Sequence, residues 1–198
     1  MKKIALAVLS VMFSTALWAQ HVPNFGVKAG LNISDWNAKN VNSDVFDSRL
    51  GFHLGLLSHI HLSNKLAFQP EVQFSTQGVE VASTNDKYKM SYINVPLMVQ
   101  YMFNNGFRVE AGPYVGFLVG AEDEGDNGTT IDRKDDYKTV DAGLGFGLNY
   151  LTYSGFGVGG RYNLGLANVS ERTTEIRNRV FQISVFYMFD NAHKAKSR

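Results

Sequence analysis

Apolar and polar residues alternate along most of the chain. In residues 25–33, Phe25 and Val27 lie on one face of an extended chain, and Lys28 and Asn32 lie on the other. Because side chains of a β-strand point alternately to its two faces, this period of two predicts strands rather than helices. We therefore predict an all-β protein. The pattern recurs in eight segments, which are residues 25–33, 50–62, 66–75, 92–101, 107–119, 140–150, 156–166 and 181–189.

The connections between these segments alternate in length. Short ones at residues 62–65, 103–106 and 152–155 alternate with long ones at residues 35–48, 78–87, 121–137 and 168–178. Short turns at one end and long polar loops at the other are typical of outer-membrane barrels, whose tilted strands need about 9–11 residues to cross the membrane. A soluble β-sandwich also alternates, but here one face is apolar in all eight segments and the other mixes glycine with charges. We predict an eight-stranded antiparallel up-and-down transmembrane β-barrel.

The first residues have the character of an export signal. Lys2 and Lys3 precede an uncharged apolar run at residues 4–17, which is shorter than the roughly 20 residues of a membrane-spanning helix. Cleavage is predicted after Ala19, with cleavage after Ala16 as the alternative. The chain therefore divides into a cleaved signal peptide at residues 1–19, a barrel domain at residues 20–189 and a short polar tail at residues 190–198.

Composition narrows the class of protein further. The chain has 198 residues, of which 44% are hydrophobic, 19% are charged and none is cysteine. A disulfide scaffold, a thiolate zinc site, a cysteine nucleophile and a lipid-modified N-terminal cysteine are therefore excluded. The formal net charge of +1 gives no reason to expect nucleic-acid binding. We predict a protein of the outer membrane of a Gram-negative bacterium, and the even number of strands places both termini in the periplasm.

Several motifs carry a family resemblance. They are FGVKAGLNIS at residues 25–34, YINVPL at residues 92–97 and GPYVG at residues 112–116. In these motifs the chain resembles the PorT-like outer-membrane β-barrel family of Bacteroidota, small barrels of the OmpA/OmpX kind. Phe189 resembles the terminal signal that the barrel-insertion machinery reads, although the tail at residues 190–198 follows it. The resemblance implies an eight-stranded barrel, and its founding member is associated with a secretion system.

Six charged residues lie on the predicted inward face. Because buried charges need partners, we predict that they form a mutually neutralising network that fills the lumen; a porin-like ion path is the alternative. Eight strands enclose an interior just wide enough for side chains, so we expect poor conduction. Inward glycines, such as Gly143, Gly145 and Gly147, should leave room for Arg108 and Arg161. The six residues are Lys28, Glu71, Arg108, Glu110, Asp141 and Arg161.

Two groups of residues have metal-binding chemistry. His59 and His61 share the inward face with His53, at a spacing that permits joint ligation from a strand. No histidine-rich partner segment is present, so we predict a structural role. The acidic loop at residues 122–136 departs from the EF-hand pattern and is interpreted as a solvated surface loop. We therefore predict neither a metal nor any other cofactor.

Catalysis is the least favoured function. Some eight-stranded barrels modify lipid A with a Ser/His site, but Ser58 and His59 are sequence neighbours and point to opposite faces of a strand; other Ser–His pairs stay open. The predicted function is a non-enzymatic barrel that contributes to envelope structure or surface interaction through four long loops. The alternatives are an accessory subunit of a secretion or assembly system and a lipid A-modifying enzyme. Expected partners are outer-membrane lipid, lipopolysaccharide, the insertion machinery and other envelope proteins, with the barrel itself monomeric.

Overall fold

Nearly all of the chain that the computed structural model describes is β-strand. The described residues are 23–38, 46–81, 86–125, 129–171 and 175–189. The predicted signal peptide and the polar tail lie outside them. The elements are β1 (Asn24–Ala38), β2 (Phe46–His61), β3 (Leu66–Val81), β4 (Lys87–Met102), β5 (Phe107–Glu124), β6 (Thr130–Asp132), the 3-10 turn η2 (Lys134–Asp136), β7 (Val140–Leu151), β8 (Phe156–Gly165) and β9 (Ile176–Met188).

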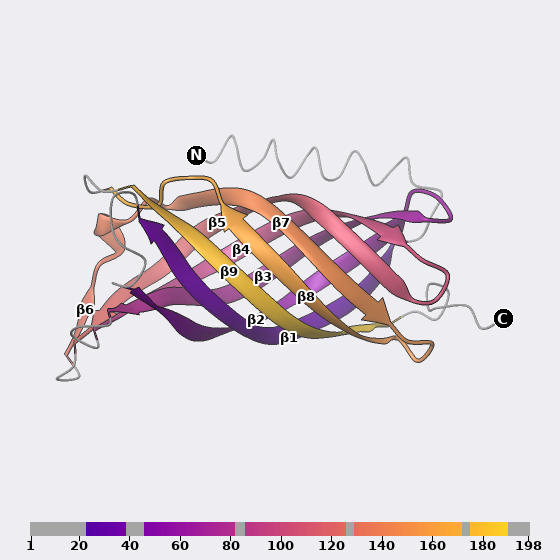
Figure 1. Cartoon of the computed structure of the whole chain (residues 1–198), viewed down its shortest axis with the longest axis horizontal. Coiled ribbons are helices and arrows are strands. Elements are labelled where there is room, and N and C mark those ends of the chain that lie inside the picture. The colour runs from indigo at the N-terminus through magenta and orange to yellow at the C-terminus, as the bar shows by residue number, and fades with distance from the viewer. Residues whose placement is uncertain (1–22, 39–45, 82–85, 126–128, 172–174, 190–198) are drawn as a thin grey trace.

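The strands form one closed antiparallel barrel (Figure 1). Around the wall the order is β1, β2, β3, β4, β5, β7, β8 and β9, and β9 pairs with β1 to complete the circle. The short strand β6 pairs only with the end of β5 and extends the long hairpin beyond the wall. Closure gives every wall strand two neighbours, so no sheet edge presents unpaired backbone groups to hydrocarbon. The predicted eight-stranded barrel is confirmed.

Within the described ranges, no helix is long and apolar enough to cross a membrane.

The two faces of the wall have opposite character. Leu50 is 69% exposed and Val185 is 59% exposed on the outside, whereas Lys28 and Glu71 are buried inside. The predicted alternation therefore holds around the wall. In water this arrangement would expose a broad apolar surface, but in a bilayer it matches apolar side chains with lipid tails.

One end of the barrel carries the short turns and an aromatic girdle. Gly106 and Gly155 have φ angles of 90° and 91° in these turns, a backbone conformation that favours glycine. Ring pairs join neighbouring strands there, such as Phe107 with Tyr150 and Phe156 with Tyr187. Phe189 lies just past β9, is 58% exposed, and donates its N–H to the carbonyl of Phe25.

The long-loop predictions are wrong in their bounds. Strand β1 continues to Ala38, β3 continues to Val81, and β5 continues to Glu124, each into a segment predicted as loop. Likewise β2 begins at Phe46 and β9 begins at Ile176. Above the apolar band the outward residues become polar, so the alternation disappears, yet the backbone ladder between neighbouring strands continues. The barrel therefore extends past its apolar band at the long-loop end.

Candidate functional site

Arg161 on β8 reaches across the lumen. Its guanidinium donates to both carboxylate oxygens of Glu71, at 2.6 and 2.9 Å. Strand β3, which carries Glu71, is four strands from β8 in either direction around the wall. The Nε of Arg161 donates to Glu110 on β5 at 2.7 Å. A single buried side chain thus joins opposite walls of the barrel.

Glu71 is the centre of this group. Besides Arg161, Lys28 on β1 approaches its carboxylate at 3.4 Å, and the amides of Gln69 and Gln73 both donate to it. Gln100 donates to Glu110 at 2.7 Å. Lys28, Glu71, Glu110 and Arg161, which we call the lumen cluster, contain two cations and two anions. Their charges cancel within a buried site, as low-dielectric surroundings require.

Asp141 lies apart from the lumen cluster, whereas Arg108 lies beside it, two residues from Glu110 on the same face of β5. Arg108 is the second residue of β5, at the short-turn end, and Asp141 is the second residue of the antiparallel β7, at the long-loop end. Asp141 pairs with Gly116, eight residues along β5 from Arg108, or about 25 Å at roughly 3.3 Å per residue. Asp141 instead accepts hydrogen bonds from Asn178 at 3.0 Å and from the Tyr114 hydroxyl at 3.4 Å. All six residues are buried, but they do not form one network.

Inward glycines make room for these groups. A Cβ at Gly147 would lie 2.7 Å from the Glu110 carboxylate, and one at Gly145 would lie 3.5 Å from Cδ of Arg161. At Gly143 the space is taken by the Tyr114 ring, 2.7 Å from a Cβ. Gly147 and Gly143 therefore leave room for Glu110 and Tyr114, whereas a Cβ at Gly145 would be closest to Oδ1 of Asn163, at 2.9 Å, and would make only an ordinary contact with Arg161. Arg108, the other predicted neighbour, is not among the nearest atoms at any of the three positions.

An apolar cluster lies toward each end of the lumen. At the long-loop end Trp36 packs among buried residues of β3, β4 and β5, and its ring lies 5.5 Å from that of Tyr88 and 5.9 Å from that of Tyr137. At the short-turn end Leu57, Leu151, Phe186 and Met188 pack together. The alternation did not reveal these clusters, because inward apolar residues are few and scattered in sequence. Together with the lumen cluster, they place buried side chains at three levels along the barrel axis.

The structure brings together a Ser–His pair that the sequence did not reveal. The ring of His53 on β2 lies 2.9 Å from Oγ of Ser184 on β9 and 2.7 Å from Oδ1 of Asn32 on the intervening β1. The Asn32 amide donates to three acceptors, so its oxygen accepts from Nδ1 of His53. Nε2 then accepts from the Ser184 hydroxyl, the order found in serine hydrolases.

This Ser–His–Asn array is buried inside the barrel. Ser184, His53 and Asn32 are each at most 2% exposed and face the lumen, between the two apolar clusters. An acyl lipid would have to pass one of these clusters to place a carbonyl beside Ser184. The array therefore serves to satisfy buried polar groups that hold β1, β2 and β9 together.

The two groups with metal-binding chemistry have protein partners. His59 and His61 meet edge to face, with ring centroids 4.9 Å apart, and Nδ1 of His59 lies 3.3 Å from the side-chain Oε1 of Gln69. In the acidic hairpin, Arg133 pairs with Asp123 at 3.2 Å and with Asp136 at 3.7 Å. Among the residues that the structure describes, no group of three metal-ligating side chains is close enough to hold an ion.

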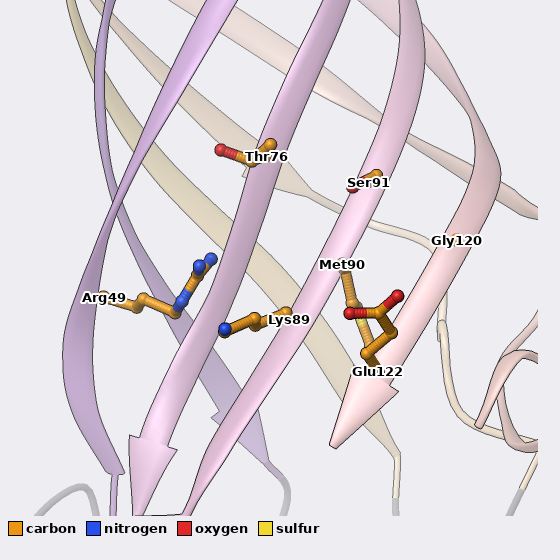
Figure 2. Close-up of a pocket in the computed structure, with 7 residues that line it drawn as sticks. All are labelled: Arg49, Thr76, Lys89, Met90, Ser91, Gly120 and Glu122. Carbon is orange, nitrogen blue, oxygen red and sulfur yellow. The ribbon is translucent and has the colours of Figure 1, made fainter. Parts of the chain in front are cut away.

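A small hollow lies on the outer wall near the long-loop end (Figure 2). Arg49 and Lys89 extend toward one another across β3, where Thr76 lies, and Glu122 borders the hollow on β5. Lys89 forms an ion pair with Glu124, and Arg49 donates to the carbonyl of Gln77 at 3.0 Å. The hollow lies beside the exposed Leu50, at the edge of the apolar band.

The combination of a lipid-facing apolar wall with a closed polar interior defines an integral outer-membrane β-barrel. Residues 18–171 match the family described as the outer membrane protein beta-barrel domain. The chain belongs to this family, and its location is the outer membrane.

Solved structures show the same architecture. Neisserial surface protein A, from Neisseria, is 16% identical, with 83% of this chain and 97% of that chain covered and a TM-score of 0.56. The Yersinia pestis attachment invasion locus protein Ail, solved in complex with the heparin analogue sucrose octasulfate, is 14% identical, with coverage of 84% and 99% and a TM-score of 0.51. At these identities the likeness shows the fold alone. No curated protein matches the sequence.

Proposed function

We propose that this protein is a non-enzymatic barrel that contributes to the surface of the outer membrane through its long-loop end. The observation that supports the proposal is the set of side chains buried in the lumen: Arg161 joins opposite walls, and an apolar cluster lies toward each end. Transport through the barrel and catalysis within it would both need an open path past these side chains. The loops and the outer wall remain as the surfaces through which the protein acts.

Planar-bilayer recording tests whether the side chains buried in the lumen block the passage of ions. The purified protein should insert without producing stepwise conductance, because a narrow barrel with side chains buried across its interior has no open water path. Reproducible open channels from the wild-type protein would contradict the proposal and favour the porin-like alternative.

The proposal also fixes an orientation, with long loops outside the cell and both termini in the periplasm. The chain contains no cysteine, so single cysteines report on orientation without background. We expect a membrane-impermeant maleimide to label Asp135→Cys, in the exposed turn η2, on intact cells. Ser154→Cys, in a short turn, should be labelled only after the cells are permeabilised. The reverse pattern would invert the orientation.

The charge of the longest hairpin suggests what the loops bind. Residues 121–137 contain seven acidic and two basic residues, and Asp132 and Asp135 are exposed. Such a surface favours a cationic partner and disfavours a sulfated ligand of the kind present in the Ail structure. Cells that express the protein should therefore retain a fluorescent oligolysine more strongly than cells that express a variant with this hairpin replaced by a short Gly/Ser turn. Equal retention by the two kinds of cell would show that this hairpin is not part of the binding surface.

An accessory role in secretion or assembly is the second candidate. It is supported by the resemblance of residues 25–34, 92–97 and 112–116 to PorT-like barrels. Extraction in mild detergent after cross-linking distinguishes the two candidates. A stoichiometric envelope partner would favour the accessory subunit, whereas recovery as a lone monomer would favour the free-standing barrel.

A further inference from the structure

We propose that the hollow on the outer wall binds the phosphate group of an outer-leaflet lipid headgroup. The hollow has the chemistry of an anion site: Arg49 and Lys89 supply cationic donors, and Thr76 and Ser91 also line it, with the Thr76 hydroxyl donating to the Phe52 carbonyl at 3.3 Å. Hydrogen bonds from charged donors to phosphate oxygens are among the strongest that proteins form. The partner implied is a phosphorylated glycolipid such as lipid A.

The position of the hollow matches the depth at which lipid phosphates lie. Thr76, Lys89 and Ser91 alternate with the buried residues Gln77 and Met90, so their side chains point outward. Directly toward the membrane the same wall exposes Leu50 and Phe52, which contact acyl chains. A lipid whose tails pack on this band therefore carries its headgroup to the level of Arg49 and Lys89.

A missing side chain creates the space. Gly120 faces outward beside Ser91, and a Cβ built on it would meet only Cβ of Ser91, at 4.0 Å. The β-bulge between Ser91 and Tyr92 brings Gly120 opposite Ser91. A larger side chain at this position would occupy the hollow without disturbing the lumen. The glycine is thus open to substitution and supplies a direct test of the site.

Acidic residues beside the hollow compete with phosphate for its cations. Lys89 is already paired with Glu124, and Glu122 borders the hollow. A second pair, between Lys87 and Glu80 at 3.5 Å, lies nearer the loops. A lipid phosphate would compete with Glu124 for the Lys89 ammonium. Removal of the Glu124 charge should consequently strengthen phosphate binding, whereas removal of either cation should weaken it.

Native mass spectrometry of the full chain in mild detergent tests the inference. Lipid A with its phosphates should bind more tightly than the same lipid after dephosphorylation. Arg49→Gln and Lys89→Gln should each weaken binding about fivefold, the contribution of one surface cation, while Glu124→Gln should strengthen it. Lys65→Gln, the same charge change in a short turn at the other end, should have no effect.

The Gly120→Leu variant distinguishes lipid binding in the hollow from attraction of the lipid to surface charge in general. It leaves every charge in place, and it should abolish the preference for the phosphorylated lipid while circular dichroism shows a folded barrel. Equal binding of dephosphorylated lipid A, an unchanged preference in Gly120→Leu, or an equal loss in Lys65→Gln would overturn the inference. Displacement of the lipid by an equal concentration of inorganic phosphate would assign the hollow to free phosphate instead.

The inference rests on the proposed orientation, because only that orientation places the hollow in the outer leaflet. An experiment can contradict the proposed orientation without contradicting the lipid site, and the reverse also holds. Binding in detergent does not depend on which way the barrel inserts, and maleimide labelling does not depend on lipid.

Discussion

Replacement of Arg161 by methionine is the sharpest test of the lumen cluster. The variant keeps much of the side-chain volume but removes the donors to Glu71 and Glu110. Both carboxylates then stay buried, with Lys28 as the remaining cation of the cluster. Loss of one partner from a buried ion pair typically costs about 3–5 kcal/mol, because the other charge is left uncompensated. We expect a loss of this size in the free energy of unfolding.

Urea unfolding in detergent measures this loss. In a chain expressed from residue 20, Trp36 is the single tryptophan. It lies in the apolar cluster at the long-loop end, so its fluorescence reports loss of the barrel. With m values of about 1–3 kcal/mol/M, the urea midpoint should fall by at least about 1 M.

Two further variants separate a buried charge effect from a general one. Arg177→Met removes an exposed arginine whose contact with Glu175 is 4.0 Å long, and it should cost less than about 0.5 kcal/mol. Glu71→Gln in the Arg161→Met background should recover part of the loss, because it neutralises a stranded carboxylate. A cost below about 1 kcal/mol for Arg161→Met, or an equal cost for Arg177→Met, would refute the account of the lumen as a coupled charge cluster.

Two smaller predictions concern the same interior, and a third concerns the C-terminal tail. Gly147→Ala places a methyl group 2.7 Å from the Glu110 carboxylate and should cost about 1–3 kcal/mol in urea unfolding; a change below about 0.5 kcal/mol would show that the lumen has slack. A fluorophosphonate probe should not label Ser184, although Ser184→Ala should cost about 1 kcal/mol through the lost bond to His53; labelling that depends on Ser184 would make the array catalytic. Truncation of residues 190–198 should leave membrane insertion intact in a heat-modifiability gel, and failure to insert would show that the tail is needed.

The wall of the barrel was predictable because it depends on one local rule. Alternation placed Lys28, Glu71 and Arg161 correctly on the inside, since each strand faces lipid along one side. The same rule does not set the height of a residue along the barrel axis. That height depends on the register between neighbouring strands, which places Arg108 and Asp141 at opposite ends. The sequence therefore indicated which charges are buried, and the register determined which of them meet.

The remaining features depend on contacts between strands distant in sequence. Ser184 and His53 are 131 residues apart, and they meet only because β9 closes the barrel against β1. Trp36 falls in a segment predicted as loop, where polar residues on the outward face hide the strand pattern. In both cases the missing information was the closure of the barrel and the height at which each strand ends.

The contrast between lumen and outer wall determines where this protein can evolve a specific interaction. In the lumen, Arg161 is bonded to carboxylates on two other strands, so a change at any one member leaves a buried charge without compensation. On the outer wall, Gly120 borders open space and Lys89 is more than one-third exposed, so a change there alters the surface and leaves the barrel folded. The energetic coupling that closes the lumen thus makes the interior a scaffold. We therefore expect recognition of lipids and of soluble partners on the wall beside the apolar band and on the loops above it.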